Sequence, residues 1–213
     1  FYPFDLIFPE FDKCVVDGSE ELPGPGVLVI WGGSDIHPKL YLRDNVHSYV
    51  STHLSERDAA EAKLFIKAVE AGLLIIGVCR GAQLGCALSG GILAQHVTGH
   101  TNDHMMETID GKSMATSSIH HQMMYPWDIE HELIAWTNYP KSSIYAGLTD
   151  MEMEKWPTHK YGEKELPIEP EIVWFPTTKC LGIQGHPEMM RPHCTFNQYI
   201  AELVKNKHKH VYG

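Results

Sequence analysis

Short apolar runs and amphipathic stretches alternate along this chain. Mostly apolar runs lie at 27–31 (VLVIW), 73–78 (LLIIGV), 171–175 (EIVWF) and 180–184 (CLGIQ), a pattern typical of strands in a buried sheet. Amphipathic helices are expected at 55–72 and 192–205, where apolar residues recur at helical spacing. Because strands and helices alternate, the pattern predicts an α/β three-layer sandwich with a mostly parallel central sheet.

Weaker patterns cover the rest of the chain. Short strands are expected at 13–16 and 105–109, and those at 133–136 and 144–145 indicate a small antiparallel extension. The charged, proline-interrupted segment 148–170 indicates either an exposed insertion or lid, or a floppy solvated loop. Residues 206–213 (NKHKHVYG) are expected to fray. A length of 213 residues suits a single domain, 1–213.

The first candidate for chemistry is Cys79, where the run 73–78 ends and a helical segment begins. Gly77 and Gly81 flank it two residues away on each side, as in a nucleophile elbow, in which a strained turn exposes the nucleophile. The helix N-terminus and the cation of Arg80 are expected to lie beside the sulfur and favour the thiolate. The alternative is that Cys79 is a buried small hydrophobe.

A second candidate follows the run 27–31, which leads into Gly32 and Gly33. Bare backbone N–H groups there could approach a substrate oxygen, which would make Gly33 half of an oxyanion hole. An ordinary tight turn is the alternative. In a doubly wound sheet, ligands bind at the carboxyl ends of strands, where Gly33 and Cys79 are both expected.

A thiol nucleophile needs a base, and the base needs a group that orients it. His186 and Glu188 fit these roles, because Pro187 restricts the chain between them and their spacing points both side chains the same way. The glutamate can then accept the second imidazole N–H and hold the tautomer.

Two other histidine groups are less specific. His100 and His104 have a spacing that could bind a metal on a helix, but no third ligand has an evident spacing, so no metal site is expected. The segment 117–122 (SSIHHQ) is a polar cluster with loop character. Loops often carry binding residues, yet paired histidines are also common on surfaces.

Composition narrows the class of protein. Seventeen Lys and Arg residues against 27 Asp and Glu give a formal net charge of −10, which disfavours nucleic acid as a partner. Five widely spaced cysteines without a CxxC pair indicate a reduced, cytoplasmic chain. No apolar run approaches the roughly 18 residues of a membrane span and no signal peptide is visible, so no membrane is expected as a partner. Because the sequence begins with Phe1, the native start is expected to lie upstream.

These motifs resemble the class I glutamine amidotransferase superfamily. The resemblance rests on GVCRGAQ (77–83), HPE (186–188) and the strand with its GG turn (29–33), and covers roughly 27–188. Further segments resemble the branch of gamma-glutamyl-gamma-aminobutyrate hydrolases and related peptidase-like proteins. These are GGSDIHPKLY (32–41), RDAAEAKLF (57–65), SSIHHQ (117–122) and LGIQGHPE (181–188).

The resemblance implies a flavodoxin-like fold and a triad of Cys79, His186 and Glu188 that cleaves a γ-glutamyl amide through a thioester. It further implies that Gly33 and Arg80 donate backbone N–H groups to the oxyanion and that no metal or organic cofactor is needed. The substrate pocket would contain Gln83, His120, His121 and Gln122. Gly185 departs from the family, which usually has a bulky residue there, and puts the substrate's identity in doubt.

Three functions stay open. A glutaminase could deliver ammonia to a synthetase on a separate chain, since the sequence has no nucleotide-binding GxxxxGK[ST] motif. A free-standing hydrolase could instead cleave glutamine-like γ-glutamyl amines. A binding module that kept the fold and lost the chemistry is the third. A homodimer is compatible with each.

Overall fold

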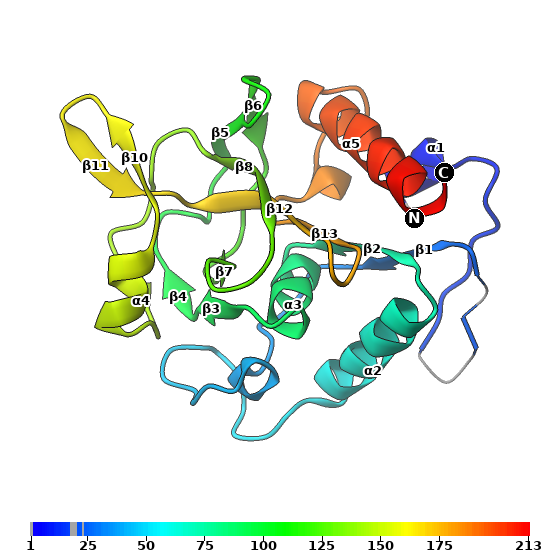
Figure 1. Ribbon diagram of the computed structural model, residues 1–213, viewed down its shortest axis with the longest axis horizontal. Coiled ribbons are helices and arrows are strands. Elements are labelled where there is room, and N and C mark those ends of the chain that lie inside the picture. Colours follow the sequence, from blue (N-terminus) through cyan, green and yellow to red (C-terminus); the bar gives the residue numbers. More distant parts are fainter. Residues whose placement is uncertain (1, 18–20, 23) are drawn as a thin grey trace.

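The computed structural model describes residues 2–17, 21–22 and 24–213. Its centre is a seven-stranded sheet with the order β1-β2-β13-β12-β8-β5-β6 (Figure 1). The strands are, in that order, β1 (Val27–Ile30), β2 (Leu74–Val78), β13 (Cys180–Ile183), β12 (Pro170–Phe175), β8 (Glu132–Thr137), β5 (His104–Thr108) and β6 (Ser113–Thr116). The first three are mutually parallel, and every later pair is antiparallel.

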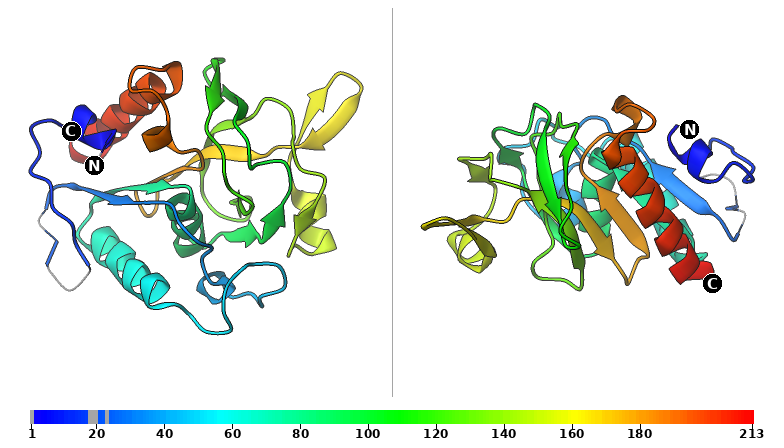
Figure 2. Two further views of the ribbon diagram at one scale, coloured as in Figure 1. Left: turned by 180° about the vertical axis from the view of Figure 1, so that it is seen from behind. Right: turned by 90° about the horizontal axis from the view of Figure 1, so that it is seen from above.

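Helices cover both faces of this sheet, which gives three layers (Figures 1 and 2). One face packs against α2 (Glu56–Glu70) and α3 (Arg80–Leu88), and Ile75 and Phe65 belong to the core there. The other face packs against α1 (Phe4–Ile7) and α5 (Thr195–Tyr212), where Ile76 and Phe196 share a core. Alternate residues of β2 therefore point to opposite layers, as a doubly covered strand requires.

This arrangement confirms the predicted α/β class. The antiparallel half is larger than the small extension expected, because β12 returns beside β13 as an antiparallel strand and β8, β5 and β6 continue from it. The prediction of a strand at 13–16 was wrong: these residues have no ladder partner, and among the described strands β1 pairs only with β2. Without a neighbouring strand, the apolar pair Val15 and Val16 cannot form a ladder.

The last helix is longer than predicted. It continues to Tyr212, whose hydroxyl donates to the carbonyl oxygen of Gly26 at 2.6 Å and accepts from the backbone N–H of Leu74 at 3.0 Å. These bonds tie the C-terminal turn to the starts of β1 and β2. Residues 206–212 are thus held by the sheet and do not fray.

Segment 148–170 has secondary structure of its own. It forms α4 (Asp150–Lys155) and a hairpin of β10 (Thr158–Tyr161) and β11 (Lys164–Pro167) that projects from one end of the molecule (Figure 1). The hairpin is largely exposed, whereas Trp156 is buried beside the rings of Tyr125 and Tyr145. The segment is therefore folded and anchored through Trp156, and the alternative of a floppy loop was wrong.

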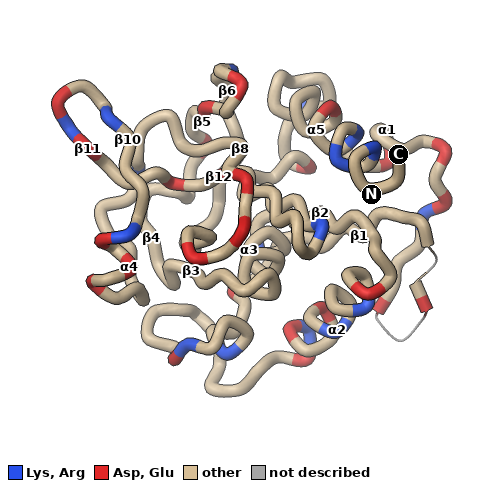
Figure 3. The backbone as a smooth tube through the Cα atoms, viewed as in Figure 1, with Lys and Arg blue, Asp and Glu red and all other residues tan. Residues whose placement is uncertain are grey.

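The remaining elements are short. They are the 3-10 turns η1 (Pro38–Tyr41) and η2 (Pro187–Met189), and the strand pairs β3 (Ile92–Ala94) with β7 (Met123–Tyr125) and β4 (His96–Val97) with β9 (Tyr145–Ala146). Acidic and basic residues are interleaved along α2 and on the β10–β11 hairpin (Figure 3). Within the described part of the chain, no helix combines the length and apolar content needed to cross a membrane.

Candidate active site

Cys79 occupies a strained turn between β2 and α3. Its backbone has φ 51° and ψ −108°, a conformation that non-glycine residues rarely adopt. A Cβ atom on Gly77 would lie 2.3 Å from the carbonyl oxygen of Gly81, and one on Gly81 would lie 2.0 Å from that of Ile30. The elbow closes only because both flanking residues are glycine, and strain of this kind is typical of functional sites.

His186 and Glu188 follow the end of β13, the parallel neighbour of β2. Nδ1 of His186 lies 2.7 Å from Oε1 of Glu188, as the predicted orienting role requires. The backbone N–H of Cys79 donates to the carbonyl oxygen of Ile183 at 2.7 Å, which joins the two strand ends. A Cβ atom on Gly32 would lie 2.9 Å from Cε1 of His186 and 3.4 Å from Cβ of Cys79. The structure thus brings Cys79, His186 and Glu188 to one place, beside Gly32.

The electrostatics of this group favour a charged imidazole. Burial lowers the pKa of His186, but the adjacent Cys79 and Glu188 raise it more, to about 10. Nε2 of His186 is buried and has no oxygen or nitrogen partner in the described part of the chain. That nitrogen is therefore free for the sulfur, and the raised pKa keeps the imidazole of His186 protonated at neutral pH.

Ser117 fixes the backbone of the histidine, a contact that sequence reasoning missed. Its hydroxyl accepts from the N–H of His186 at 2.9 Å and donates to the carbonyl oxygen of the same residue at 2.8 Å. The close packing of this segment also explains why residue 185 is glycine. A Cβ atom on Gly185 would lie 2.1 Å from Oγ1 of Thr116 and 3.0 Å from the carbonyl oxygen of Ser117. The bulky residue usual in the family has no room here.

The turn at Gly32 and Gly33 is held by Arg57 of α2. Nη2 of Arg57 donates to the carbonyl oxygens of Trp31 and Gly32 at 3.2 and 3.0 Å. Gly33 has φ 151°, and a Cβ there would lie 2.2 Å from Nη1 of Arg57. Because the arginine occupies two carbonyl groups on one side of the turn, it fixes the orientation of the peptide units that would form the predicted oxyanion hole.

Arg80 does not place its charge beside the sulfur, so that expectation was wrong. Its guanidinium is 1% exposed, lies 2.5 Å from Oδ1 of Asp58, and also pairs with Glu61. These carboxylates of α2 neutralise the cation. The side chain therefore ties α3 to α2, and only the backbone N–H of Arg80, in the first turn of α3, is left for the predicted oxyanion role.

The predicted substrate-binding residues divide into two groups. Nε2 of Gln83 donates to the carbonyl oxygen of Gln122 at 3.2 Å, and Nδ1 of His120 lies 2.9 Å from the same oxygen, so these three buried residues form one cluster. His121 points elsewhere and pairs through Nε2 with Oδ1 of Asp35 at 2.8 Å. Burial, together with the neighbouring histidine rings, holds the pKa of His120 well below its ordinary value.

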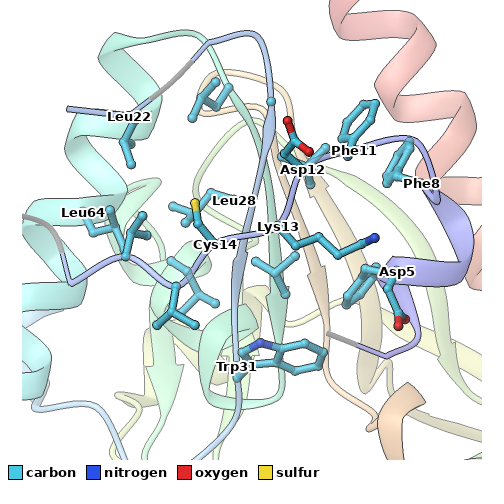
Figure 4. Close-up of a pocket in the computed structure, with 18 of the residues that line it drawn as sticks. Asp5, Phe8, Phe11, Asp12, Lys13, Cys14, Leu22, Leu28, Trp31 and Leu64 are labelled. Carbon is cyan, nitrogen blue, oxygen red and sulfur yellow. The ribbon is translucent and has the colours of Figure 1, made fainter. Parts of the chain in front are cut away.

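A separate cavity of about 650 Å³ lies between the N-terminal segment, β1 and α2 (Figure 4). Its lining includes Phe8, Cys14, Leu28 and Leu64, and Trp31 lies at one end of it (Figure 4). None of the three triad residues lines this cavity. The chemistry defined above therefore does not open into it.

Comparison with known proteins gives three kinds of similarity. The Peptidase C26 family model matches residues 25–128, slightly under half of the chain. A glutamine amidotransferase-like protein of Rickettsia prowazekii is 36% identical over 72 residues, which cover 34% of this chain and 25% of that protein. A candidate glutamine amidotransferase of Mycobacterium tuberculosis is 34% identical over 102 residues, 46% of this chain and 31% of that protein.

The likeness in structure extends over the whole chain. A candidate GMP synthase component from Thermoplasma acidophilum superposes with a TM-score of 0.60 at 14% identity, over 99% of this chain and 87% of that one. At this identity the likeness shows the fold alone. The sequence matches span only about a quarter to a third of the two curated relatives.

The fold and the matched segments support the resemblance to the class I glutamine amidotransferase-like superfamily that the motifs indicate. Within this class the chain is similar to the Peptidase C26 family, and the match includes the elbow at Cys79 but ends before His186 and Glu188. The second half of the triad therefore rests on geometry.

Proposed function

We propose that this protein hydrolyses a γ-glutamyl amide bond, with glutamine as substrate, through a γ-glutamyl thioester on Cys79. The observation that carries the proposal is the junction of the β2 and β13 ends, where the elbow cysteine meets a histidine whose ring bonds Glu188 at 2.7 Å. A nucleophile, a base and an orienting carboxylate are the parts that acyl transfer to a thiol requires.

In the first step, the Cys79 thiolate attacks the γ-carbonyl carbon, and the oxyanion accepts hydrogen bonds from the N–H groups of Gly33 and Arg80. The imidazolium of His186 gives its proton to the nitrogen as the C–N bond breaks, and ammonia leaves. In the second step a water attacks the thioester while neutral His186 takes its proton. The C–S bond breaks, glutamate leaves, and the thiolate–imidazolium pair is restored. Glu188 keeps the ring oriented throughout.

The oxyanion hole should supply a large part of the rate. One such donor is typically worth about 2.7–4 kcal/mol of transition-state stabilisation. Here the fixed features are the Arg57 bonds to the 31–33 turn and the strained turn before α3. Gln83, His120 and Gln122 form the buried polar cluster proposed to hold the glutamyl part of the substrate. His121, which was also predicted to bind substrate, pairs with Asp35 outside this cluster.

We further propose that the ammonia is used by a synthetase on a separate chain; the relatives from Rickettsia prowazekii and Mycobacterium tuberculosis are described as glutamine amidotransferase-like, in keeping with ammonia transfer. A second candidate is a free-standing hydrolase of γ-glutamyl amines, which the match to the Peptidase C26 family favours. The two candidate functions use the same triad, and they differ in whether a partner protein is needed for its activity. A partner-dependent glutaminase is slow alone, whereas a free-standing hydrolase turns over steadily.

The test compares ammonia release from glutamine with amine release from γ-glutamyl amines, using the purified protein with and without proteins that co-purify with it. Cys79→Ala should abolish every activity. Cys14→Ala is the control, because that thiol is exposed and lies outside the triad. Full activity in Cys79→Ala would refute the proposed chemistry, and steady turnover of γ-glutamyl amines without a partner would select the second candidate.

A further inference from the structure

A second cluster of buried ionisable groups lies behind the His120–Gln122 segment. His100, His120 and Glu171 are 0%, 3% and 1% exposed, and each offers one ligand atom within 4.8 Å of the other two. His100 lies in the loop before β5, His120 in the loop before β7, and Glu171 in β12. Because the three residues are far apart in the sequence, no sequence motif reveals the cluster. The spacing of His100 and His104 does not by itself predict a metal site, because no third ligand is evident in the sequence. The fold brings His120 and Glu171 beside His100 as the further candidate ligands.

Both rings are set up to present a bare nitrogen to the cluster. Nε2 of His100 lies 3.1 Å from Oε2 of Glu169, and Nδ1 of His120 lies 2.9 Å from the carbonyl oxygen of Gln122. Each of these nitrogens faces an acceptor and must carry the ring proton. The opposite nitrogens, Nδ1 of His100 and Nε2 of His120, are buried and have no hydrogen-bond partner in the part of the chain that the structure describes. A histidine that ligates a metal typically donates its other N–H to a carboxylate or a backbone carbonyl in this way.

Glu169 is well suited to that supporting role. Its carboxylate accepts from the backbone N–H groups of Lys141 and Ser142 at 2.7 and 2.8 Å, and from the hydroxyl of Tyr145 at 2.8 Å. Because all of these partners are donors, the Glu169 carboxylate acts as an acceptor, and Nε2 of His100 donates to it. This fixes the tautomer of the His100 ring.

Glu171 completes the cluster. Its Oε1 is bonded to Nε2 of His104 at 2.7 Å, while Oε2 is buried and has no partner in the described part of the chain. The two unpartnered ring nitrogens and the Glu171 carboxylate therefore lie together, with Nδ1 of His100 3.6 Å from Oε1 and with Oε2 still lacking a donor in the described part of the chain. Buried acceptors left in this state are costly, and a cation at their centre would satisfy all three.

We propose that His100, His120 and Glu171 bind a divalent metal ion of the zinc class. Two imidazole nitrogens and one carboxylate oxygen are a donor set typical of zinc, which binds four ligands and can take water as the fourth. Ligand atoms of a tetrahedral zinc lie about 3.4 Å apart, so modest side-chain rotations close the present group around an ion. The ion would fix His120 and, through the carbonyl of Gln122, the position of Gln83.

The burial of the ligands dictates the experiment. A site with no exposed ligand is loaded as the chain folds, so the protein is unfolded in guanidinium with a chelator, freed of metal, and refolded with equimolar Zn²⁺, with Co²⁺ or with neither. Metal per chain is measured by mass spectrometry of the elements, and Co²⁺ is also followed by its visible absorption, which is intense in tetrahedral sites. The expected result is one ion per chain and a higher Tm for the refolded protein with Zn²⁺.

Matched variants locate the ion. His120→Asn and Glu171→Gln should each lose stoichiometric metal and the Co²⁺ absorption, whereas His53→Asn, at an exposed histidine outside the cluster, should keep both. If a cluster variant fails to refold, the wild-type comparison of metal content and Tm still decides the matter. A wild type that refolds without binding Zn²⁺ or Co²⁺, or a cluster variant that binds as wild type does, would overturn the proposal. Metal content is independent of glutaminase activity, so this result stands apart from the proposed function.

Discussion

Replacing Ser117 with alanine tests whether the backbone of His186 must be pinned for catalysis. The hydroxyl is the partner of both the N–H and the carbonyl oxygen of His186, at 2.9 and 2.8 Å, and Ser117 is only 6% exposed. Each buried group left unsatisfied costs about 1–3 kcal/mol. Because two groups lose their partner, we expect Ser117→Ala to lower the free energy of unfolding by about 2–6 kcal/mol. A displacement of the ring by about 1 Å should lower kcat roughly 100-fold.

The matched control is Thr108→Ala in the β5–β6 hairpin. The Thr108 hydroxyl likewise accepts from the N–H of Lys112 at 3.0 Å and lies 3.2 Å from its carbonyl oxygen, and it also donates to Oδ1 of Asp110 at 2.5 Å. It lies outside the candidate site, so its loss should change stability and leave kcat as in wild type. Urea unfolding and steady-state glutamine hydrolysis measure the two effects. A Ser117→Ala variant with wild-type kcat, or equal losses of kcat in both variants, would refute the positioning role.

Three further predictions concern charge and space. Because Cys79 and Glu188 hold the pKa of His186 at about 10, the imidazole stays protonated below that pH, and kcat/KM should fall as the pH rises through about 10. Glu188→Gln should shift this fall in kcat/KM toward neutral pH. An unchanged pH profile would contradict the role of Glu188 beside His186. Arg80→Met leaves the buried carboxylate of Asp58 without its cation and should lower the free energy of unfolding in urea by about 3–5 kcal/mol. An unchanged free energy of unfolding would show that this ion pair does not stabilise the fold. Gly81→Ala should lower Tm far more than Gly111→Ala, because the first Cβ would lie 2.0 Å from the carbonyl oxygen of Ile30, whereas the second meets no atom within 4 Å and is disfavoured only by the positive φ of 78°. Equal shifts in a thermal melt would contradict the close packing of the elbow.

The elements nearest the site could be predicted from sequence because their signals are local. The β2 run, the two glycines around Cys79 and the cap of α2 by Ser55, whose hydroxyl accepts from the N–H of Asp58 at 3.0 Å, all lie within a few residues of what they determine. The orientation of Glu188 toward His186 is equally local. Such features depend on backbone geometry and short-range hydrogen bonds, which the sequence displays directly.

The features that could not be predicted depend on distant partners. Tyr212 extends α5 through a bond to Gly26, 186 residues away, although the tail is polar enough to fray. From the sequence, Arg80 is expected to place its cation beside the Cys79 thiol. In the structure its guanidinium instead donates to Asp58, which lies 22 residues earlier in the chain. The Ser117 contact spans 69 residues, and nothing in the segment 117–122 indicates that its serine bonds His186. Tertiary packing decided each of these cases.

The most direct test of the central claim is intact-protein mass spectrometry of samples quenched with acid during turnover of glutamine and of γ-glutamyl amines. The account predicts a species heavier by one γ-glutamyl group, located on Cys79 by peptide mapping, absent from Cys79→Ser and still present in Cys14→Ala. An acyl group found on another residue, or hydrolysis that continues unchanged in Cys79→Ser, would contradict it.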